Sequence, residues 1–420
     1  MHPNALLELA TELLHQVLRF EHPADSVVSD FFRRQRALGA RERHTLAETT
    51  YAVLREKPLL QHLAQSGKGE MERRLAILAW QGNAAFLRAA LAPAEVAWLE
   101  QVQQVDRAAL PERLRHNLPD WLAERLHAEL APGEFWPLVE ALNRPAGLDL
   151  RVNVLKAKRE DAQAALATAG LAAEPTPYSP VGLRLSGKPQ LHKLDVFLRG
   201  DVEVQDEGSQ LLALVTGARR GEMVADFCAG AGGKTLALGA MMRNTGRLYA
   251  FDVSGHRLAA LKPRLARSGL SNVYPVQIAH ERDERIKRLA GKIDRVLVDA
   301  PCSGLGTLRR NPDLKWRQSP ASVAEMSVKQ AAILASAARL VKPGGRLVYA
   351  TCSLLQAENE AIAQAFSATH GAEFRVLPAL EALRKAQVDK AESLASGDFM
   401  RLWPQQHGTD AFFAALWERV

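Results

Sequence analysis

Two of the three cysteines in this chain stand where chemistry is common in α/β proteins. Cys302 follows a segment that we expect to be a strand ending at Asp299, and Cys352 follows another that ends at Ala350. Open parallel sheets bind their ligands at the carboxyl ends of the strands. A single cysteine is more often a small buried apolar residue, but two thiols at one sheet edge favour nucleophilic chemistry. We interpret the third, Cys228, as a packing residue.

A glycine-rich segment, Asp226 to Thr235, lies between an expected strand and an expected helix. A P-loop needs glycine where Cys228 stands, and a dinucleotide fingerprint needs glycine where Thr235 stands, so both sites are disfavoured. Asp252 ends the next expected strand. A carboxylate there suits the ribose of S-adenosylmethionine, whose amino-acid part needs close approach to glycine backbone. Besides Asp252, the residues expected to bind this cofactor are Cys228, Ala229, Gly230, Ala231, Gly232, Gly233 and Lys234.

A thiol beside a methyl donor indicates methylation of carbon 5 of a pyrimidine. That carbon is not nucleophilic by itself, but addition of a thiolate at carbon 6 creates an enamine that can attack the sulfonium methyl. The added negative charge must be stabilised near N3 and the exocyclic amine, and a carboxyl such as Asp299 suits this task. The proton on carbon 5 must leave before the thiol is eliminated, so a second group near the base is useful.

The elements that must position these residues begin at about residue 210, where strands and helices alternate. This pattern predicts a doubly wound, Rossmann-like α/β domain. The expected strands are Met223 to Asp226, Arg247 to Asp252, Val273 to Gln277, Ile293 to Asp299 and Arg346 to Ala350. The expected helices are Lys234 to Met242, Ser254 to Arg267 and Ser322 to Val341.

Two further regions precede this domain, and the 420 residues are enough for two to three domains. Apolar residues recur at three- and four-residue spacing in residues 1–140, which predicts an all-helical domain. Residues 145–205 combine short strands with one helix and predict a small α+β subdomain. Six basic residues make RNA binding by this subdomain an expectation: Arg151, Lys156, Lys158, Arg159, Lys188 and Lys193. Residues 206–420 then form the catalytic domain.

The net charge of +7 is unevenly distributed. Residues 1–140 carry 16 Lys+Arg and 19 Asp+Glu, whereas residues 141–420 carry 38 and 28. This excess suits a polyanionic partner such as RNA, although a merely basic surface would have the same composition. Three scattered cysteines and the lack of a long apolar run favour a cytoplasmic protein without a membrane anchor.

Several motifs together resemble the Sun family of RNA cytosine-5 methyltransferases. The matching segments are Cys228 to Thr235, Asp299 to Thr307, Arg310 to Asp313 with Lys315-Trp316, Tyr349 to Ser353, Val204 to Gln210, Trp403-Pro404 and His407 to Asp410. The N-terminal region is similar to the NusB-type helical domain of the bacterial small-subunit ribosomal RNA member, with Arg41 to Arg43 and Tyr51 to Arg55 as its best-matching stretches.

The resemblance implies a class I methyltransferase fold and a role for each thiol. Cys352 would be the nucleophile and Cys302 would assist release, while Asp299 would face both the cytosine and the cofactor. Two departures from the family pattern occur. Gly230-Ala231 replaces a common Ala-Pro, and the acid usually found near the adenine is missing, because Ile278-Ala279-His280 occupies that stretch. His280 could hydrogen-bond the adenine amine instead.

The expected function is therefore methylation of carbon 5 of a cytosine in small-subunit ribosomal RNA, by a monomer that needs no metal. One alternative is a ribosome-assembly or antitermination factor that binds RNA without catalysis, and loss of Cys302, Cys352 or Asp299 would have favoured it. Another is a DNA cytosine-5 methyltransferase. Such enzymes usually carry a large recognition region between their late motifs, whereas only a short stretch separates the two cysteines here.

Overall fold

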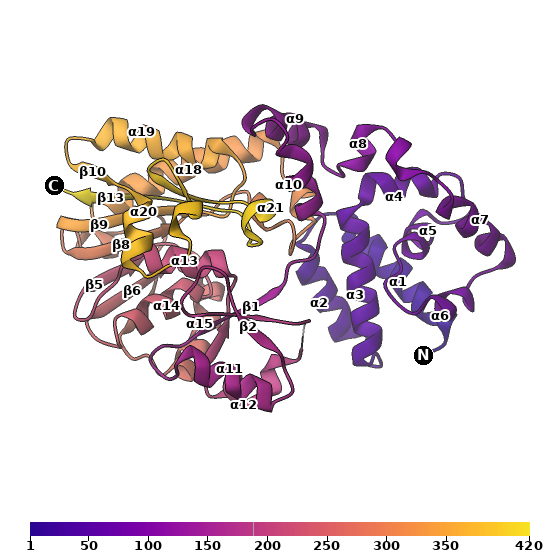
Figure 1. Ribbon diagram of the computed structural model, residues 1–420, viewed down its shortest axis with the longest axis horizontal. Coiled ribbons are helices and arrows are strands. Elements are labelled where there is room, and N and C mark those ends of the chain that lie inside the picture. Colours follow the sequence, from indigo (N-terminus) through magenta and orange to yellow (C-terminus); the bar gives the residue numbers. More distant parts are fainter. Residues whose placement is uncertain (188) are drawn as a thin grey trace. The chain divides into compact units, whose positions relative to one another are not determined.

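Residues 1–187 and 189–420 are described by a computed structural model (Figure 1), in which they form two units. The first comprises Met1–Pro145 and Thr307–Pro320, and the second comprises Ala146–Gly306 and Ala321–Val420. Lys188, one of the six basic residues noted above, lies outside the described residues. Within the described part of the chain, no helix has the length and apolar character needed to cross a membrane.

The first unit is helical, as the apolar spacing predicts. Its core is formed mainly by leucine side chains from several helices, among them Leu7, Leu14, Leu46 and Leu54, which are fully buried. The helices of residues 1–145 are α1 (Pro3–Val17), α2 (Ala24–Arg34), α3 (Ala40–Arg55), α4 (Lys57–Ala64), α5 (Met71–Leu78), α6 (Ala84–Arg88), α7 (Pro93–Gln103), α8 (Glu112–Arg115), α9 (Asp120–Glu129) and α10 (Phe135–Leu142).

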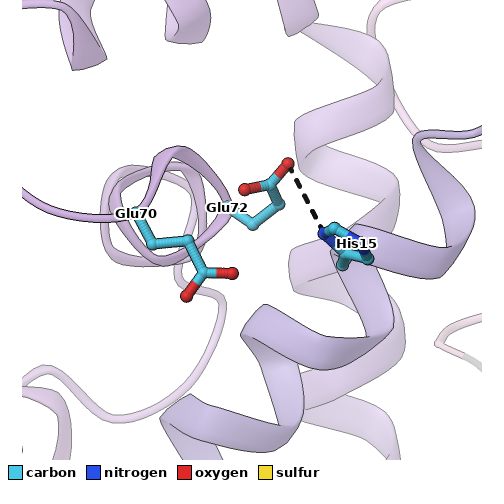
Figure 2. Close-up of side chains that lie close together, drawn as sticks. All are labelled: His15, Glu70 and Glu72. Atoms are coloured by element: carbon cyan, nitrogen blue, oxygen red, sulfur yellow. Dashed lines mark ion pairs between the residues drawn. The ribbon is translucent and has the colours of Figure 1, made fainter.

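Three side chains of this unit, His15 on α1 with Glu70 and Glu72 at the start of α5, could together approach a cation (Figure 2). His15 Nδ1 lies 4.0 Å from Glu72 Oε1, and both His15 and Glu70 are exposed. Exposed pairs of this kind contribute little to stability. We interpret the group as a surface ion pair.

A segment far along the chain, Thr307–Pro320, also belongs to the helical unit. It contains α17 (Leu314–Arg317). Trp316 packs against the core and its indole Nε1 donates to Leu54 O at 2.7 Å. The buried Lys315 donates to Arg55 O at 2.7 Å. The sequence analysis instead places this segment in the catalytic domain. The two assignments differ because tertiary contacts, which residue spacing does not reveal, decide which helices a short segment packs against.

The second unit begins with a small antiparallel sheet of four strands in the order β2-β3-β1-β4. The central strand β1 pairs with both β3 and β4. The strands are β1 (Leu148–Val152), β2 (Ala173–Pro175), β3 (Gly182–Leu185) and β4 (Val202–Val204), and the helices are α11 (Arg159–Thr168) and α12 (Asp195–Leu198). This is the α+β arrangement that the sequence predicts for residues 145–205.

The larger sheet has the order β11-β12-β13-β9-β8-β5-β6-β7, with β10 paired to β13. Strands β9, β8, β5, β6 and β7 are parallel, and their order reverses between β8 and β5, which is the position where such sheets bind ligands. The parallel strands are β5 (Met223–Asp226), β6 (Arg247–Asp252), β7 (Val273–Gln277), β8 (Ile293–Asp299) and β9 (Val341–Thr351). They confirm the five predicted strands, although β9 begins earlier than expected.

The antiparallel part of this sheet was not predicted. It consists of β10 (Phe374–Leu377), β11 (Ala395–Ser396), β12 (Phe399–Leu402) and β13 (Phe412–Arg419). Strand β13 lies beside β9 and is almost entirely buried, with Trp417 and Phe413 fully inside. A continuous apolar run such as Phe412 to Trp417 lacks the alternation that identifies a strand exposed on one face.

Helices cover both faces of the large sheet (Figure 1). Helices α13, α14 and α20 pack in one apolar cluster, whereas α18 and α19 pack in another. The helices of this region are α13 (Glu207–Thr216), α14 (Gly233–Met241), α15 (Gly255–Ser268), α16 (Glu284–Lys287), α18 (Pro320–Ala338), α19 (Glu360–His370), α20 (Ala379–Lys385) and α21 (Pro404–His407). This doubly covered sheet is the predicted class I, Rossmann-like methyltransferase fold.

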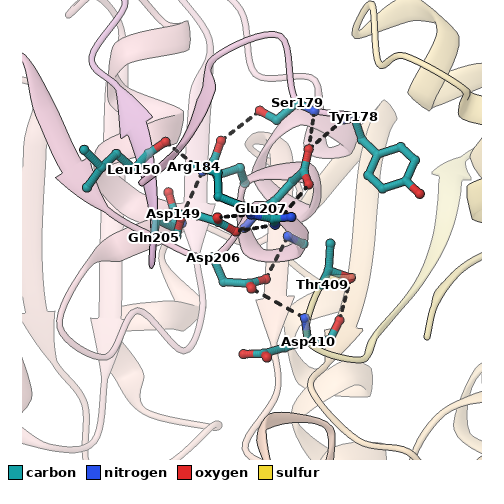
Figure 3. A network of polar contacts seen from close by, with 12 residues as sticks. Asp149, Leu150, Tyr178, Ser179, Arg184, Gln205, Asp206, Glu207, Thr409 and Asp410 are labelled. Atoms are coloured by element: carbon teal, nitrogen blue, oxygen red, sulfur yellow. Dashed lines mark hydrogen bonds and ion pairs between the residues drawn. The ribbon is translucent and has the colours of Figure 1, made fainter. Parts of the chain in front are cut away.

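A buried polar network joins the small sheet to helix α13 (Figure 3). Arg184 Nε and Asp149 Oδ1 lie 2.7 Å apart. The fully buried Glu207 accepts hydrogen bonds from Tyr178 N at 2.6 Å and Ser179 N at 2.8 Å. Burial raises the pKa of Glu207. The motif Val204 to Gln210 therefore has a structural role at this junction.

Candidate active site

The glycine-rich loop connects β5 to α14 at the edge where the strand order reverses. Gly230 and Gly232 have φ values of +55° and +81°, in the left-handed region that favours glycine. A Cβ at Gly232 would lie 2.2 Å from Leu261 Cδ1, whereas a Cβ at Gly230 would meet no atom within 4 Å. The loop therefore packs tightly on α15 at one glycine and leaves open space at the other.

Asp252, at the end of β6, faces the glycine-rich loop and is hydrogen-bonded to its backbone. Its Oδ2 accepts a hydrogen bond from Gly230 N at 2.8 Å, and its Oδ1 accepts one from Ser254 N at 2.7 Å. Each carboxylate oxygen can accept a further hydrogen bond. The structure thus brings together the two parts of the predicted cofactor site that the sequence separates.

Asp226, at the end of β5, is a second carboxylate beside the loop, and the sequence analysis gave it no role beyond ending the strand. The residue is 1% exposed. Its Oδ2 accepts from Thr235 Oγ1 at 2.7 Å, while its Oδ1 has no hydrogen-bond partner among the described residues. Burial raises the pKa of Asp226 to about 7. An unsatisfied buried carboxyl oxygen here fits a site that receives a polar ligand.

Cys228, within the loop, is partly buried against the apolar cluster that contains Phe227 and Phe251. Burial raises the pKa of its thiol well above the ordinary value. Both observations agree with our interpretation of Cys228 as a packing residue.

The two remaining cysteines meet at the ends of neighbouring strands. Strands β8 and β9 are parallel, with Asp299 opposite Ala350, so the loops that follow them run side by side. Cys302 Sγ and Cys352 Sγ lie 3.4 Å apart, and both are free thiols. The hydrogen bond with Cys352, together with burial, raises the pKa of Cys302 well above the ordinary value. The thiol form of Cys302 is therefore favoured at the contact between the two sulfurs.

Asp299 pairs with Lys234, a contact that the sequence analysis did not foresee. Lys234 Nζ lies 2.7 Å from Asp299 Oδ2, and the two side chains are 12% and 28% exposed. Burial lowers the pKa of Lys234, but the negative groups around it, Asp299 foremost, outweigh burial and raise that pKa overall. The site therefore holds a fixed positive charge next to a carboxyl group that solvent can still reach.

His280 is exposed in the loop after β7, where its Nδ1 accepts a hydrogen bond from Arg282 N at 3.1 Å. The buried Asp283 also lies in this loop and accepts from Ala279 N at 2.9 Å. That hydrogen bond lowers the pKa of Asp283. The stretch Ile278 to His280, which lacks an acid of its own, is thus in contact with Asp283, because the turn after it brings Asp283 back to Ala279.

Comparison with known families supports this arrangement. A sequence model described as 16S rRNA methyltransferase RsmB/F matches residues 213–418. A second, described as an RsmF/B-like ferredoxin-like domain, matches residues 118–192. The first region contains the cofactor loop and both strand-end cysteines, and the second contains most of the small sheet.

Comparison with individual relatives and with a solved structure also finds similarity to ribosomal RNA methyltransferases and to a chain of the same fold. The chain is 37% identical to a probable ribosomal RNA small subunit methyltransferase B of Synechocystis. This alignment spans 302 residues and covers 72% of this chain and 66% of that protein. It is 36% identical to a ribosomal RNA small subunit methyltransferase B of Sodalis glossinidius, covering 65% of this chain and 63% of that protein. The aligned region is thus just under two thirds of these relatives. The crystal structure of PH0851 superimposes with a TM-score of 0.81 at 26% identity, covering 100% of this chain and 99% of that one.

Proposed function

Since the chain belongs to the RsmB/F family of 16S rRNA methyltransferases, we propose that it transfers a methyl group from S-adenosylmethionine to carbon 5 of a cytosine in small-subunit ribosomal RNA. The observation that carries this proposal is the pair of free thiols 3.4 Å apart at the ends of β8 and β9. Carbon 5 and carbon 6 of cytosine are bonded neighbours, so two thiols at this spacing can act on one ring.

The residues around the glycine loop fit the cofactor. Gly230 leaves open space, Asp226 Oδ1 is an unsatisfied buried acceptor, and Asp252 keeps acceptor capacity for ribose hydroxyls. Backbone between Cys228 and Lys234 would hold the amino-acid part, and His280 would lie toward the adenine. When bound, the cofactor supplies an electrophilic methyl group on a sulfonium sulfur.

The side chains of the site then divide the reaction between them. The thiolate of Cys352 adds to carbon 6, which forms a carbon–sulfur bond and makes carbon 5 nucleophilic toward the methyl group. Asp299 accepts a hydrogen bond from the exocyclic amine, while the charge of Lys234 stabilises the negative charge that develops on the ring. Once Cys352 is bonded to carbon 6, the hydrogen bond and the charge by which it raises the pKa of Cys302 are lost, so Cys302 can release its proton to solvent. The Cys302 thiolate then accepts the carbon 5 proton, and the electron pair left behind restores the double bond and expels the sulfur of Cys352.

We assign the remaining regions to RNA binding. Residues 1–140, as a NusB-like domain, and residues 145–205 hold the RNA, while residues 206–420 catalyse the reaction. The protein works as a monomer in the cytoplasm, without a metal ion. The excess of basic residues after residue 140 supports RNA binding by residues 145–205, and the match of residues 213–418 to the methyltransferase model supports catalysis by residues 206–420.

The test is methylation by the purified chain of small-subunit ribosomal RNA, free or assembled with ribosomal proteins, followed by bisulfite sequencing. We expect one cytosine to become resistant to bisulfite only when the cofactor is present, and none with the Cys352→Ala protein. Binding of RNA without any methylation would instead support an assembly factor. Methylation of duplex DNA in preference to RNA would support a DNA methyltransferase.

A further inference from the structure

Glu358 is a buried carboxylate beneath the two cysteine loops, and the reaction described above gives it no role. It follows β9 and is 0% exposed. Its Oε1 accepts hydrogen bonds from Ser303 N at 2.8 Å and from Gln330 Nε2 at 3.0 Å. Its Oε2 accepts from Ser303 Oγ at 2.5 Å and from Ser353 Oγ. Burying a charged group is costly unless it is hydrogen-bonded in this way.

The partners of Glu358 are the residues that directly follow the two cysteines. Ser303 comes after Cys302 and Ser353 comes after Cys352, so each serine belongs to a different strand-end loop. The two hydroxyl oxygens lie 3.3 Å apart, almost the same distance as the two sulfurs. One carboxylate therefore fastens both loops to each other.

Helix α18 completes this arrangement through Gln330. The Gln330 amide donates to Glu358 Oε1 and also to Pro301 O, at 2.9 Å, in the residue before Cys302. The Cys302 loop is thus held on both sides of its cysteine. From strand β9, Tyr349 OH donates to Glu358 O at 2.6 Å and fixes the backbone that carries the carboxylate.

We propose that Glu358 is a positioning residue that sets the distance between Cys302 and Cys352 by holding Ser303 and Ser353 together. This inference rests on the proposed function, in which both sulfurs must act on adjacent carbons of one ring. A displacement of about 1 Å at a reacting group can reduce a rate by about 100-fold. If the two loops moved independently, Cys352 could add to carbon 6 while Cys302 lay too far from carbon 5 to assist release.

The charge of Glu358 also affects the two cysteines unequally. The pKa of Cys302 is raised by its hydrogen bond with Cys352 and by burial, and the charges of Cys352 and Glu358 raise it further. The carboxylate thereby favours the protonated form of Cys302 before the reaction begins, so that the two cysteines are chemically distinct.

The experiment compares Glu358→Gln with Glu207→Gln, a matched control. Glu207 is equally buried in the same unit, but it accepts from the backbone of Tyr178 and Ser179, away from the cysteine loops. For Glu358→Gln we expect kcat to fall by about 10- to 100-fold with an unchanged KM for S-adenosylmethionine. The control should keep a kcat within about twofold of the wild-type value.

A second measurement does not depend on methylation. Limited alkylation with iodoacetamide under reducing conditions, read by mass spectrometry, gives the ratio of modification at Cys352 to that at Cys302. We expect this ratio to fall by about 10-fold in Glu358→Gln and to stay unchanged in Glu207→Gln. If the wild-type chain methylates no RNA, the proposed function fails, yet the alkylation ratio still tests the positioning role.

Ser303→Ala and Ser353→Ala keep the test decisive if Glu358→Gln does not fold. Each should shift the alkylation ratio in the same direction, and each should add little when combined with Glu358→Gln, because all three act through one contact. The proposal is overturned if Glu358→Gln or both serine variants keep wild-type kcat and alkylation ratio. Equal losses in Glu207→Gln would overturn it as well, since they would reflect stability alone.

Discussion

At the scale of single residues, the site depends on two sulfur atoms that are in contact but have unequal environments. Cys302 is hydrogen-bonded to Cys352 and the buried Glu358 lies beneath its loop, so its thiol form is favoured. The charge of Cys352 helps to raise the pKa of Lys234. This asymmetry suits one thiol for addition and the other for release.

Replacing Cys352 by alanine should abolish methyl transfer while cofactor affinity changes little. The thiolate is needed for addition to carbon 6, whereas the cofactor contacts lie in the glycine loop and at Asp252. We expect the rate to fall by more than about 10,000-fold. Transfer of labelled methyl to RNA measures the loss, and calorimetric titration measures cofactor binding. A variant that methylates at the wild-type rate would show that Cys352 is not the nucleophile.

Replacing Cys302 by alanine should allow methyl transfer but prevent release of the RNA. The adduct forms and the methyl group is transferred, but the ring stays saturated at carbon 5 until its proton is removed, so Cys352 remains bonded to RNA. Denaturing gel electrophoresis should show a slow protein–RNA band, which the double variant with Cys352→Ala lacks. A slow band in Cys352→Ala alone would reverse the two roles.

At the scale of elements, the segment Thr307–Pro320 is notable because it follows the Cys302 loop in sequence and yet belongs to the helical unit. Lys315 is its most unusual residue. The side chain is 2% exposed, and burial lowers the pKa of Lys315 to about 7. The nearby charge of Arg55 contributes to this lowering.

Lys315 should make the helical unit more stable as the pH rises above 7. Between about pH 7 and the usual lysine pKa of about 10.4, the unfolded chain binds a proton that the folded chain does not, so unfolding becomes less favourable with increasing pH. We expect Lys315→Met to remove about 1–2 kcal/mol of stabilisation gained between pH 7 and pH 9. Hydrogen-exchange protection of α3 at the two pH values measures the effect.

The exposed Lys68, in the same unit, provides the control. Lys68→Met should leave the pH dependence of wild-type protection unchanged, because the charge of an exposed side chain contributes little to stability. The same pH dependence in Lys315→Met and in the wild type would contradict the effect assigned to Lys315.

At the scale of the whole molecule, the proposed function raises the question of which basic residues would contact RNA. The structure removes two candidates from the basic residues of the small sheet. Arg151 is buried and donates to Gln205 Oε1 at 2.7 Å. Lys156 donates to two backbone carbonyl groups, those of Arg199 and Arg267, at 2.6 and 2.7 Å. Their charges serve the fold, whereas Lys158 and Lys193 are exposed.

Neutralising Lys158 and Lys193 together should weaken RNA binding and make it less sensitive to salt. Each phosphate contact that is lost removes about one released counterion, so the slope of log affinity against log salt should fall by about 1 per residue. Filter-binding titrations at several salt concentrations measure the slope. Lys68→Ala, in the negatively charged N-terminal region, should have a smaller effect, and an equal effect would contradict the proposed RNA surface.

The sequence alone determined the parts of this protein that depend on local pattern. Alternating strands and helices, with an acid or a cysteine near the ends of four of the five strands, were enough to predict the parallel sheet and the edge at which Asp299, Cys302 and Cys352 meet. Each of these signals is contained within about ten residues, and parallel strands necessarily bring their carboxyl ends together.

Only the tertiary structure decided what depends on residues distant in the sequence. The pairing of Lys234 with Asp299, the contact of Glu358 with Ser303 and the place of Trp316 in the helical core join positions that no local period connects. Strand β13 was missed because it is buried on both faces, which removes the alternation by which a strand is identified. Local sequence reflects which face of an element is apolar, whereas a buried polar contact requires that the chain has already folded.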